Sequence, residues 1–216
     1  RRHPDLRWSR PYHSMIDDSV DALLHREPQW RVVDCPQPAI LHDGYRPELL
    51  AGSDKTARLR KAMESELAAH PGDPYASAKL GGLLISEGKQ AEAIPLLHSG
   101  LERATRPNGE RYELLLHLGM ALTPTDAAGA VECYRQALTI PLDPRASLGA
   151  RINLAARLMD QGALDEAIEV YQGGAKAFPS HAKMLGRLAR AYAVRAYGHP
   201  RDGVGGYAVA KEFGLR

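Results

Sequence analysis

The feature that most constrains this chain is a three-residue pattern that recurs along about two-thirds of its length. In each copy, a small residue is followed four positions later by a bulky residue and seven positions later by another small residue. The copies are Ala93/Leu97/Gly100, Ala130/Tyr134/Ala137, Ala167/Tyr171/Gly174 and a degenerate Gly203/Tyr207/Ala210. Their first residues, 93, 130, 167 and 203, are 37, 37 and 36 residues apart. Steps of four and seven lie on one face of a helix, and an internal period of this length indicates stacked structural repeats.

A second pattern predicts another helix before each of these. It is a leucine followed by a small residue, and its copies are Leu80-Gly81, Leu118-Gly119, Leu154-Ala155 and Leu188-Ala189. Pro and Gly in the intervening segments "HPGDP", "RPNGE", "IPLDP" and "FPSHA" end the preceding helices. We therefore predict a mainly α fold in which residues 72–216 form a solenoid of helix pairs. The expected repeats are 72–107, 108–144, 145–180 and a degenerate 181–216.

The chain before residue 72 lacks this pattern. Residues 51–71 are amphipathic and end at a proline, so we expect one helix that caps the open end of the array. The sequence of residues 1–50 predicts a segment of mixed strand and helix, with strands or extended stretches in 5–13 and 30–43. Between them we expect a short helix, with Ser14 as N-cap and Asp17 in the capping-box position.

The repeats resemble the tetratricopeptide repeat (TPR) family, whose pattern combines Leu-Gly, Tyr, Ala-x3-Phe and Pro within about 34 residues. Residues 148–181 fit best, with Leu154, Ala167, Tyr171 and Pro179 at the expected offsets. The first-helix Trp of the family is absent from every repeat. The resemblance implies a right-handed superhelix of antiparallel helix pairs that binds a protein or peptide through its concave groove.

Alignment on the Leu-small pairs predicts which side chains line this groove. The candidates are Lys79, His117, Asn153, Lys183, Arg187 and Arg190. Asn153, Lys183 and Arg187 resemble part of the carboxylate clamp by which some TPR domains hold a peptide C-terminus. Leu116 and Met120 occupy other clamp positions and break the pattern. The sequence allows a clamp, a general peptide- or protein-binding groove, or a purely structural array that docks on its own transferase domain.

The N-terminal motifs "YHSM" and "AILHDGYR" resemble the C-terminal end of bacterial family-2 glycosyltransferases that carry TPR repeats. The matching residues are His13, Ile40, His42, Gly44 and Tyr45, whereas Ser14 stands where that family usually has Glu. The resemblance implies that His13 or His42 binds a divalent metal in an intact transferase, next to a nucleotide-sugar. No Asp-x-Asp motif occurs in the sequence, so we predict no catalytic residue and no cofactor for the chain itself.

The charge is balanced, with 28 basic and 26 acidic residues, which argues against a nucleic-acid partner. No apolar run approaches the roughly 18 residues that a membrane span requires. The two cysteines, Cys35 and Cys133, form no disulfide framework, and we expect a cytoplasmic protein. The predicted function is a protein- or peptide-interaction module. The alternative is the C-terminal part of a family-2 glycosyltransferase whose repeats recruit or orient the acceptor.

Overall fold

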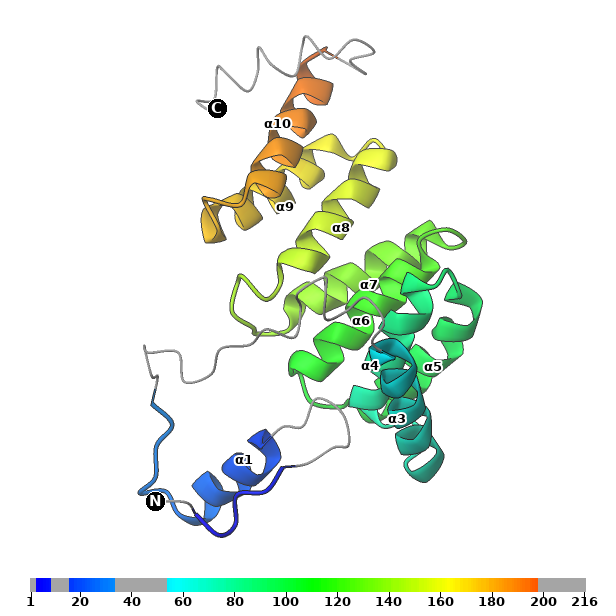
Figure 1. Ribbon diagram of the computed structural model, residues 1–216. Helices are drawn as coiled ribbons and strands as arrows, with labels where there is room; N and C mark the ends of the chain where they lie inside the picture. Colours follow the sequence, from blue (N-terminus) through cyan, green and yellow to red (C-terminus); the bar gives the residue numbers. More distant parts are fainter. Residues whose placement is uncertain (1–2, 9–15, 34–53, 198–216) are drawn as a thin grey trace. The chain divides into compact units, whose positions relative to one another are not determined.

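A computed structural model describes residues 3–8, 16–33 and 54–197 of the chain (Figure 1). The chain divides into two compact units, Arg1–Glu66 and Leu67–Arg216. The ranges 1–50, 51–71 and 72–216 stay predictions as domain boundaries.

The first unit contains α1 (Asp17–Arg26) and most of α3 (Lys55–Ala69). Within the described residues it contains no strand, so the expected strands are wrong for 5–8 and 30–33. The remainder of both ranges lies outside the described residues. Residues 5–8 meet α1 through a side chain, since the Arg7 backbone N–H donates to Ser19 Oγ at 3.1 Å. α3 lies within the predicted range 51–71, and its role as a cap stays a prediction.

The start of α1 also differs from the expectation. The helix begins at Asp17 after Ile16, and no side chain makes a capping hydrogen bond there. Ser14 lies outside the described residues. The Ser19 hydroxyl instead donates to the Ile16 carbonyl oxygen at 2.7 Å, so it interacts with the first turn from inside the helix.

Seven helices form the described part of the second unit. The first helices of the successive repeats are α4 (Pro74–Ser86), α6 (Gly109–Leu122), α8 (Leu148–Asp160) and α10 (Ala182–Tyr197). The second helices are α5 (Gln90–Arg103), α7 (Ala127–Thr139) and α9 (Leu164–Ala177). Each helix packs against the next one in sequence, and α4 also packs against α6 (Figure 1). This is the predicted mainly α array of helix pairs.

Local chemistry at the turns explains where several helices begin and end. Asp73 and Asn108 lie in the predicted turn segments, and their side chains accept backbone N–H bonds from the first turns of α4 and α6. Gly88 and Gly162 follow α4 and α8 with φ of 76° and 79°, a conformation that favours glycine. At these positions the sequence of the repeat specifies its own helix boundary.

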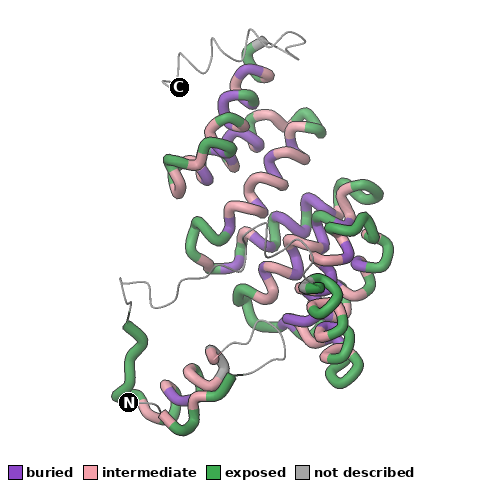
Figure 2. Tube along the Cα trace, viewed as in Figure 1, coloured by how far each residue is buried: buried purple, intermediate pink, exposed green. Residues whose placement is uncertain are grey.

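The Leu-small pairs bring the two helices of a repeat into close contact. A Cβ on Gly81 would lie 2.5 Å from Leu97 Cδ2, and a Cβ on Gly119 would lie 2.5 Å from Tyr134 Cε1. The bulky residue of each of these second helices therefore packs against the glycine backbone of the first helix. Figure 2 shows the resulting line of buried residues where the helices face one another.

The last small residue of the pattern lies where one repeat meets the next. A Cβ on Gly100 of α5 would lie 2.7 Å from Ser77 Cβ of α4 and 2.8 Å from Leu114 Cδ2 of α6. Gly174 of α9 similarly faces α10, because a Cβ at that position would overlap Met184 Cε. This position therefore joins successive repeats.

One further contact links the second and third repeats. The Ala150 backbone N–H, in the first turn of α8, donates to the hydroxyl of Tyr112 on α6 at 3.2 Å. Ser147, at the N-cap position of α8, makes no capping bond. Its hydroxyl donates to the Pro144 carbonyl and accepts a bond from Arg151 Nε. Tyr112 thus supplies the N-terminal acceptor that α8 lacks in its own sequence.

We expect Gly119→Ala to lower the free energy of unfolding by about 1–3 kcal/mol, because the added methyl group overlaps the buried Tyr134 ring. Gly186→Ala is the matched control, since a Cβ there meets nothing within 4 Å. It should raise stability by about 0.4–1 kcal/mol. Urea unfolding of both variants measures these effects, and equal behaviour of the two would contradict the packing described.

We expect Tyr112→Phe to cost about 1–2 kcal/mol, because the Ala150 N–H loses its acceptor. Tyr171→Phe removes the same atom from a second buried tyrosine, whose hydroxyl makes no hydrogen bond to any described residue. Thermal melts should show a clear decrease for Tyr112→Phe alone. A similar decrease for both variants would mean that Tyr112 does not cap α8.

Candidate ligand-binding face

A cavity of about 330 Å³ lies between the first helices of the last two repeats. It is lined by Ala156, Arg157, Met159, Asp160, Tyr171, Arg187 and Arg190. α8 contributes the first four of these residues and α10 the two last arginines. Three of the lining residues carry guanidinium groups and one carries a carboxylate, so the cavity is predominantly positive.

The arginines of the cavity differ in how they are engaged. Arg157 forms an ion pair with Asp160, with a distance of 3.0 Å between Nη2 and Oδ2. Arg187 is half-buried and Arg190 is exposed. Among the described residues, neither of these two makes a hydrogen bond or an ion pair. Two cations on α10 are therefore not engaged by any residue that the structure describes.

The predicted groove residues of the first two repeats are engaged inside the protein. Lys79 Nζ of α4 lies 2.6 and 2.8 Å from the two carboxylate oxygens of Glu113 on α6. His117 Nδ1 lies 2.9 Å from the Ala78 carbonyl oxygen, which also connects α6 to α4. The His117 ring packs against Gly82, because a Cβ there would lie 2.6 Å from Cε1. These side chains hold α4 and α6 together, and ligand binding by them stays a prediction.

Burial governs the charge of His117. Removal of the ring from water lowers the pKa of His117 below its usual value, and the nearby Lys79 ammonium lowers it further. Glu113 and the Ala78 carbonyl oppose this shift. A neutral ring that donates from Nδ1 fits the contact with Ala78.

The structure therefore separates the predicted groove residues into groups. Lys79 and His117 lie together between α4 and α6, and Arg187 and Arg190 lie together in the cavity. Asn153 is half-buried on α8 and Lys183 is exposed on α10, and neither lines the cavity.

Sequence reasoning missed Arg157 and Asp160. Arg157 follows Asn153 by four residues, so the helical period would have placed it on the same face as that candidate. The pairing of Asp160 with Arg157 depends on its position at the end of α8, which the repeat pattern does not specify.

Cys133 belongs to the buried core of the array. Its side chain is buried, and burial raises the pKa of the Cys133 thiol to about 11. A thiol that stays protonated at neutral pH is a poor nucleophile and a poor metal ligand.

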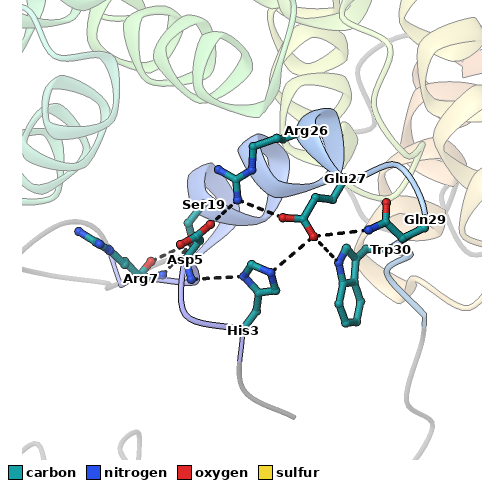
Figure 3. Close-up of polar contacts among 8 residues, drawn as sticks. All are labelled: His3, Asp5, Arg7, Ser19, Arg26, Glu27, Gln29 and Trp30. Carbon is teal, nitrogen blue, oxygen red and sulfur yellow. Dashed lines mark hydrogen bonds and ion pairs between the residues drawn. The ribbon is translucent and has the colours of Figure 1, made fainter.

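A separate polar cluster lies in the first unit (Figure 3). Possible metal-binding atoms of His3, Asp5 and Glu27 all lie within 4.8 Å of one another. The guanidinium of Arg26 contacts both carboxylates, and the Trp30 indole N–H donates to Glu27 Oε2 at 2.9 Å. The Trp30 bond is the main reason why the pKa of Glu27 lies below its usual value. These groups satisfy one another and attach residues 3–7 to α1.

His13 and His42, the predicted metal ligands of an intact transferase, lie outside the described residues. The same is true of Ile40, Gly44 and Tyr45, which carry the rest of the glycosyltransferase resemblance. That resemblance therefore stays a prediction.

The sequence and the fold are both similar to those of known proteins. A TPR repeat-containing protein of Synechococcus elongatus is 39% identical over 180 residues, or 83% of this chain. The chain spans 45% of the length of that relative. A crystal structure of MamA superposes with a TM-score of 0.59 at 18% identity, covering 80% of this chain and 93% of MamA.

A second similar structure is YrrB, described as a TPR protein with an unusual peptide-binding site. It superposes with a TM-score of 0.55 at 19% identity, covering 76% of this chain and 79% of YrrB. The repeats of this chain are tetratricopeptide repeats. No family model matches the sequence.

No helix in the described part of the chain, whether in the TPR array or before it, is long and apolar enough to cross a bilayer.

The TPR array should lose stability as the pH falls through the usual histidine range. His117 binds a proton less readily in the folded state, so acid favours the unfolded state, and stability rises again with pH. Unfolding free energies measured from pH 7.5 to 5.5 should fall less in His117→Asn, whose amide replaces Nδ1 without titrating. Parallel pH profiles for the two proteins would contradict the lowered pKa of His117.

Proposed function

We propose that this chain is a protein-interaction module that binds a peptide segment of a partner on the face formed by the first helices of its repeats. The observation that carries the proposal is the cavity between α8 and α10, with two arginines that have no partner among the described residues. Its volume of about 330 Å³ lies in the range of ordinary ligand sites, and it is large enough for one or two side chains.

The architecture supports a peptide as the ligand. Stacked helix pairs form an extended surface, and such a surface can contact several residues of an extended peptide. YrrB, which has a similar fold, is described as having a peptide-binding site. Lys79 and His117 hold α4 and α6 together, which favours the α8–α10 end as the point of ligand contact.

Two finer proposals follow from the sequence. A carboxylate clamp that uses Asn153, Lys183 and Arg187 is compatible with their partly or fully exposed side chains. Membership of a longer family-2 glycosyltransferase stays a prediction from the N-terminal motifs, and nothing in residues 3–8, 16–33 or 54–197 favours it over the interaction module.

The test uses one substitution that fills the cavity. Ala156 lines the cavity and is half-buried, so Ala156→Phe should occupy the space that a ligand side chain would take. Ala128→Phe adds the same group to an exposed position on α7, a second helix. Peptides selected from a random library against the unmodified chain should bind Ala156→Phe at least about tenfold more weakly, and Ala128→Phe equally well.

Isothermal titration calorimetry provides the affinities, and circular dichroism confirms that both variants fold. The proposal is wrong if no selected peptide binds the folded chain with a Kd below about 1 mM, the limit of weak specific binding. It is also wrong if filling the cavity leaves every affinity unchanged.

A further inference from the structure

Charge is unevenly distributed on α10. The whole chain is nearly balanced, with 28 basic and 26 acidic residues. α10 by contrast contains four basic residues and no acidic one, in the sequence AKMLGRLARAYAVRAY. Such an imbalance within one helix is not needed for packing, because its buried residues are Met184, Leu188, Ala189, Ala191 and Ala193.

Three of these four cations lie along one face. Lys183, Arg187 and Arg190 are spaced by four and three residues, which places them one turn apart on the same side of the helix. None of the three makes an ion pair or hydrogen bond with any described residue. We call these three residues the α10 basic stripe.

The fourth basic residue of α10, Arg195, has an acidic partner, unlike the three residues of the stripe. Arg195 Nη1 lies 3.0 Å from Asp165 Oδ1 on α9, so it is neutralised within the array. Within the cavity lining the stripe meets one acidic residue, Asp160 of α8, and Asp160 already pairs with Arg157. Three like charges one turn apart repel one another, and an external anion would relieve that repulsion.

We propose that the α10 basic stripe binds an acidic segment of a partner protein through the side-chain carboxylates of at least two Asp or Glu residues. This inference rests on the proposed function and names the chemistry of its ligand. Carboxylates make charge-assisted, often bidentate bonds with Arg. The Arg157–Asp160 pair is an example of an Arg–carboxylate contact at the edge of the same cavity.

The cavity adds a second requirement to the ligand. Met159 and Tyr171 line it together with Arg187 and Arg190. An apolar side chain next to the acidic residues would therefore be buried beside the guanidinium groups. We expect the preferred segment to combine two or three acidic residues with one apolar residue.

The experiment measures the binding of short fluorescent peptides of equal length to the full chain by anisotropy. One peptide carries three Glu residues and one Leu and has an amidated C-terminus. A second replaces each Glu by Gln, and a third is this neutral peptide with a free C-terminal carboxylate. A single-stranded oligonucleotide of equal negative charge is the fourth ligand.

The variants are Arg187→Gln, Arg190→Gln and the double substitution. Lys176→Gln is the matched control, because Lys176 is exposed on α9 and outside the stripe, and its loss changes net charge equally. We expect the acidic amidated peptide to bind at least about tenfold more tightly than the neutral peptide. Each stripe substitution should weaken it about tenfold, Lys176→Gln should not, and higher salt should weaken it in the unmodified chain.

Each other result overturns the inference in a distinct way. Equal binding of acidic and neutral peptides leaves the interaction module intact but refutes acidic recognition. Binding that requires only the free C-terminus indicates a single carboxylate rather than an acidic segment. Tighter binding of the oligonucleotide through the same arginines indicates nucleic acid, and no peptide binding at all refutes the proposed function as well.

Discussion

The first two repeats of the array depend on contact between a glycine backbone in one helix and a bulky side chain in the next. Tyr134 packs directly on Gly119, and Leu97 packs on Gly81 in the same way. Such contact brings the helix axes close together and excludes water from the apolar side chains between them. In the first two repeats the small residue is glycine, so the two helices of each pair come together at a similar close distance. Among the first helices, α4 and α6 pack side by side, whereas α6 and α8 meet at only a few residues.

The two ends of the described array use polar side chains differently. Between α4 and α6, Lys79 bonds with Glu113 and His117 bonds with the Ala78 carbonyl, and both contacts hold the two helices together. At the other end, Arg187 and Arg190 line a cavity and have no partner among the described residues. A fully engaged cation mainly contributes to the fold, whereas an unengaged one retains its interaction energy for a ligand. Both ends of the array carry basic side chains, and they differ in whether those side chains have partners among the described residues.

The repeat pattern was sufficient to predict the helices of the array, because they follow from the helical period, whereas the contact of Gly119 with Tyr134 is a tertiary feature that the structure adds. The pattern does not cover residues 5–8 and 30–33, whose composition was interpreted as strand or extended chain. A strand also requires a hydrogen-bonded neighbour, and no strand forms at these residues. The candidate site was predicted in part. Arg187 and Arg190 follow from alignment of the repeats, but their meeting with Asp160 depends on the angle between α8 and α10. The pairing of Lys79 with Glu113, 34 residues away, is likewise a tertiary contact that one sequence does not specify.

The hydroxyl of Tyr112 at the start of α8 has a consequence for the order of assembly. A ribosome releases α6 before α8, so the acceptor for the Ala150 N–H is in place before the helix that requires it has been synthesised. The third repeat therefore receives part of its nucleation from the second. Growth from the N-terminus toward the C-terminus is favoured at this junction, and in an isolated third repeat the Ala150 N–H would depend on water in place of the Tyr112 hydroxyl.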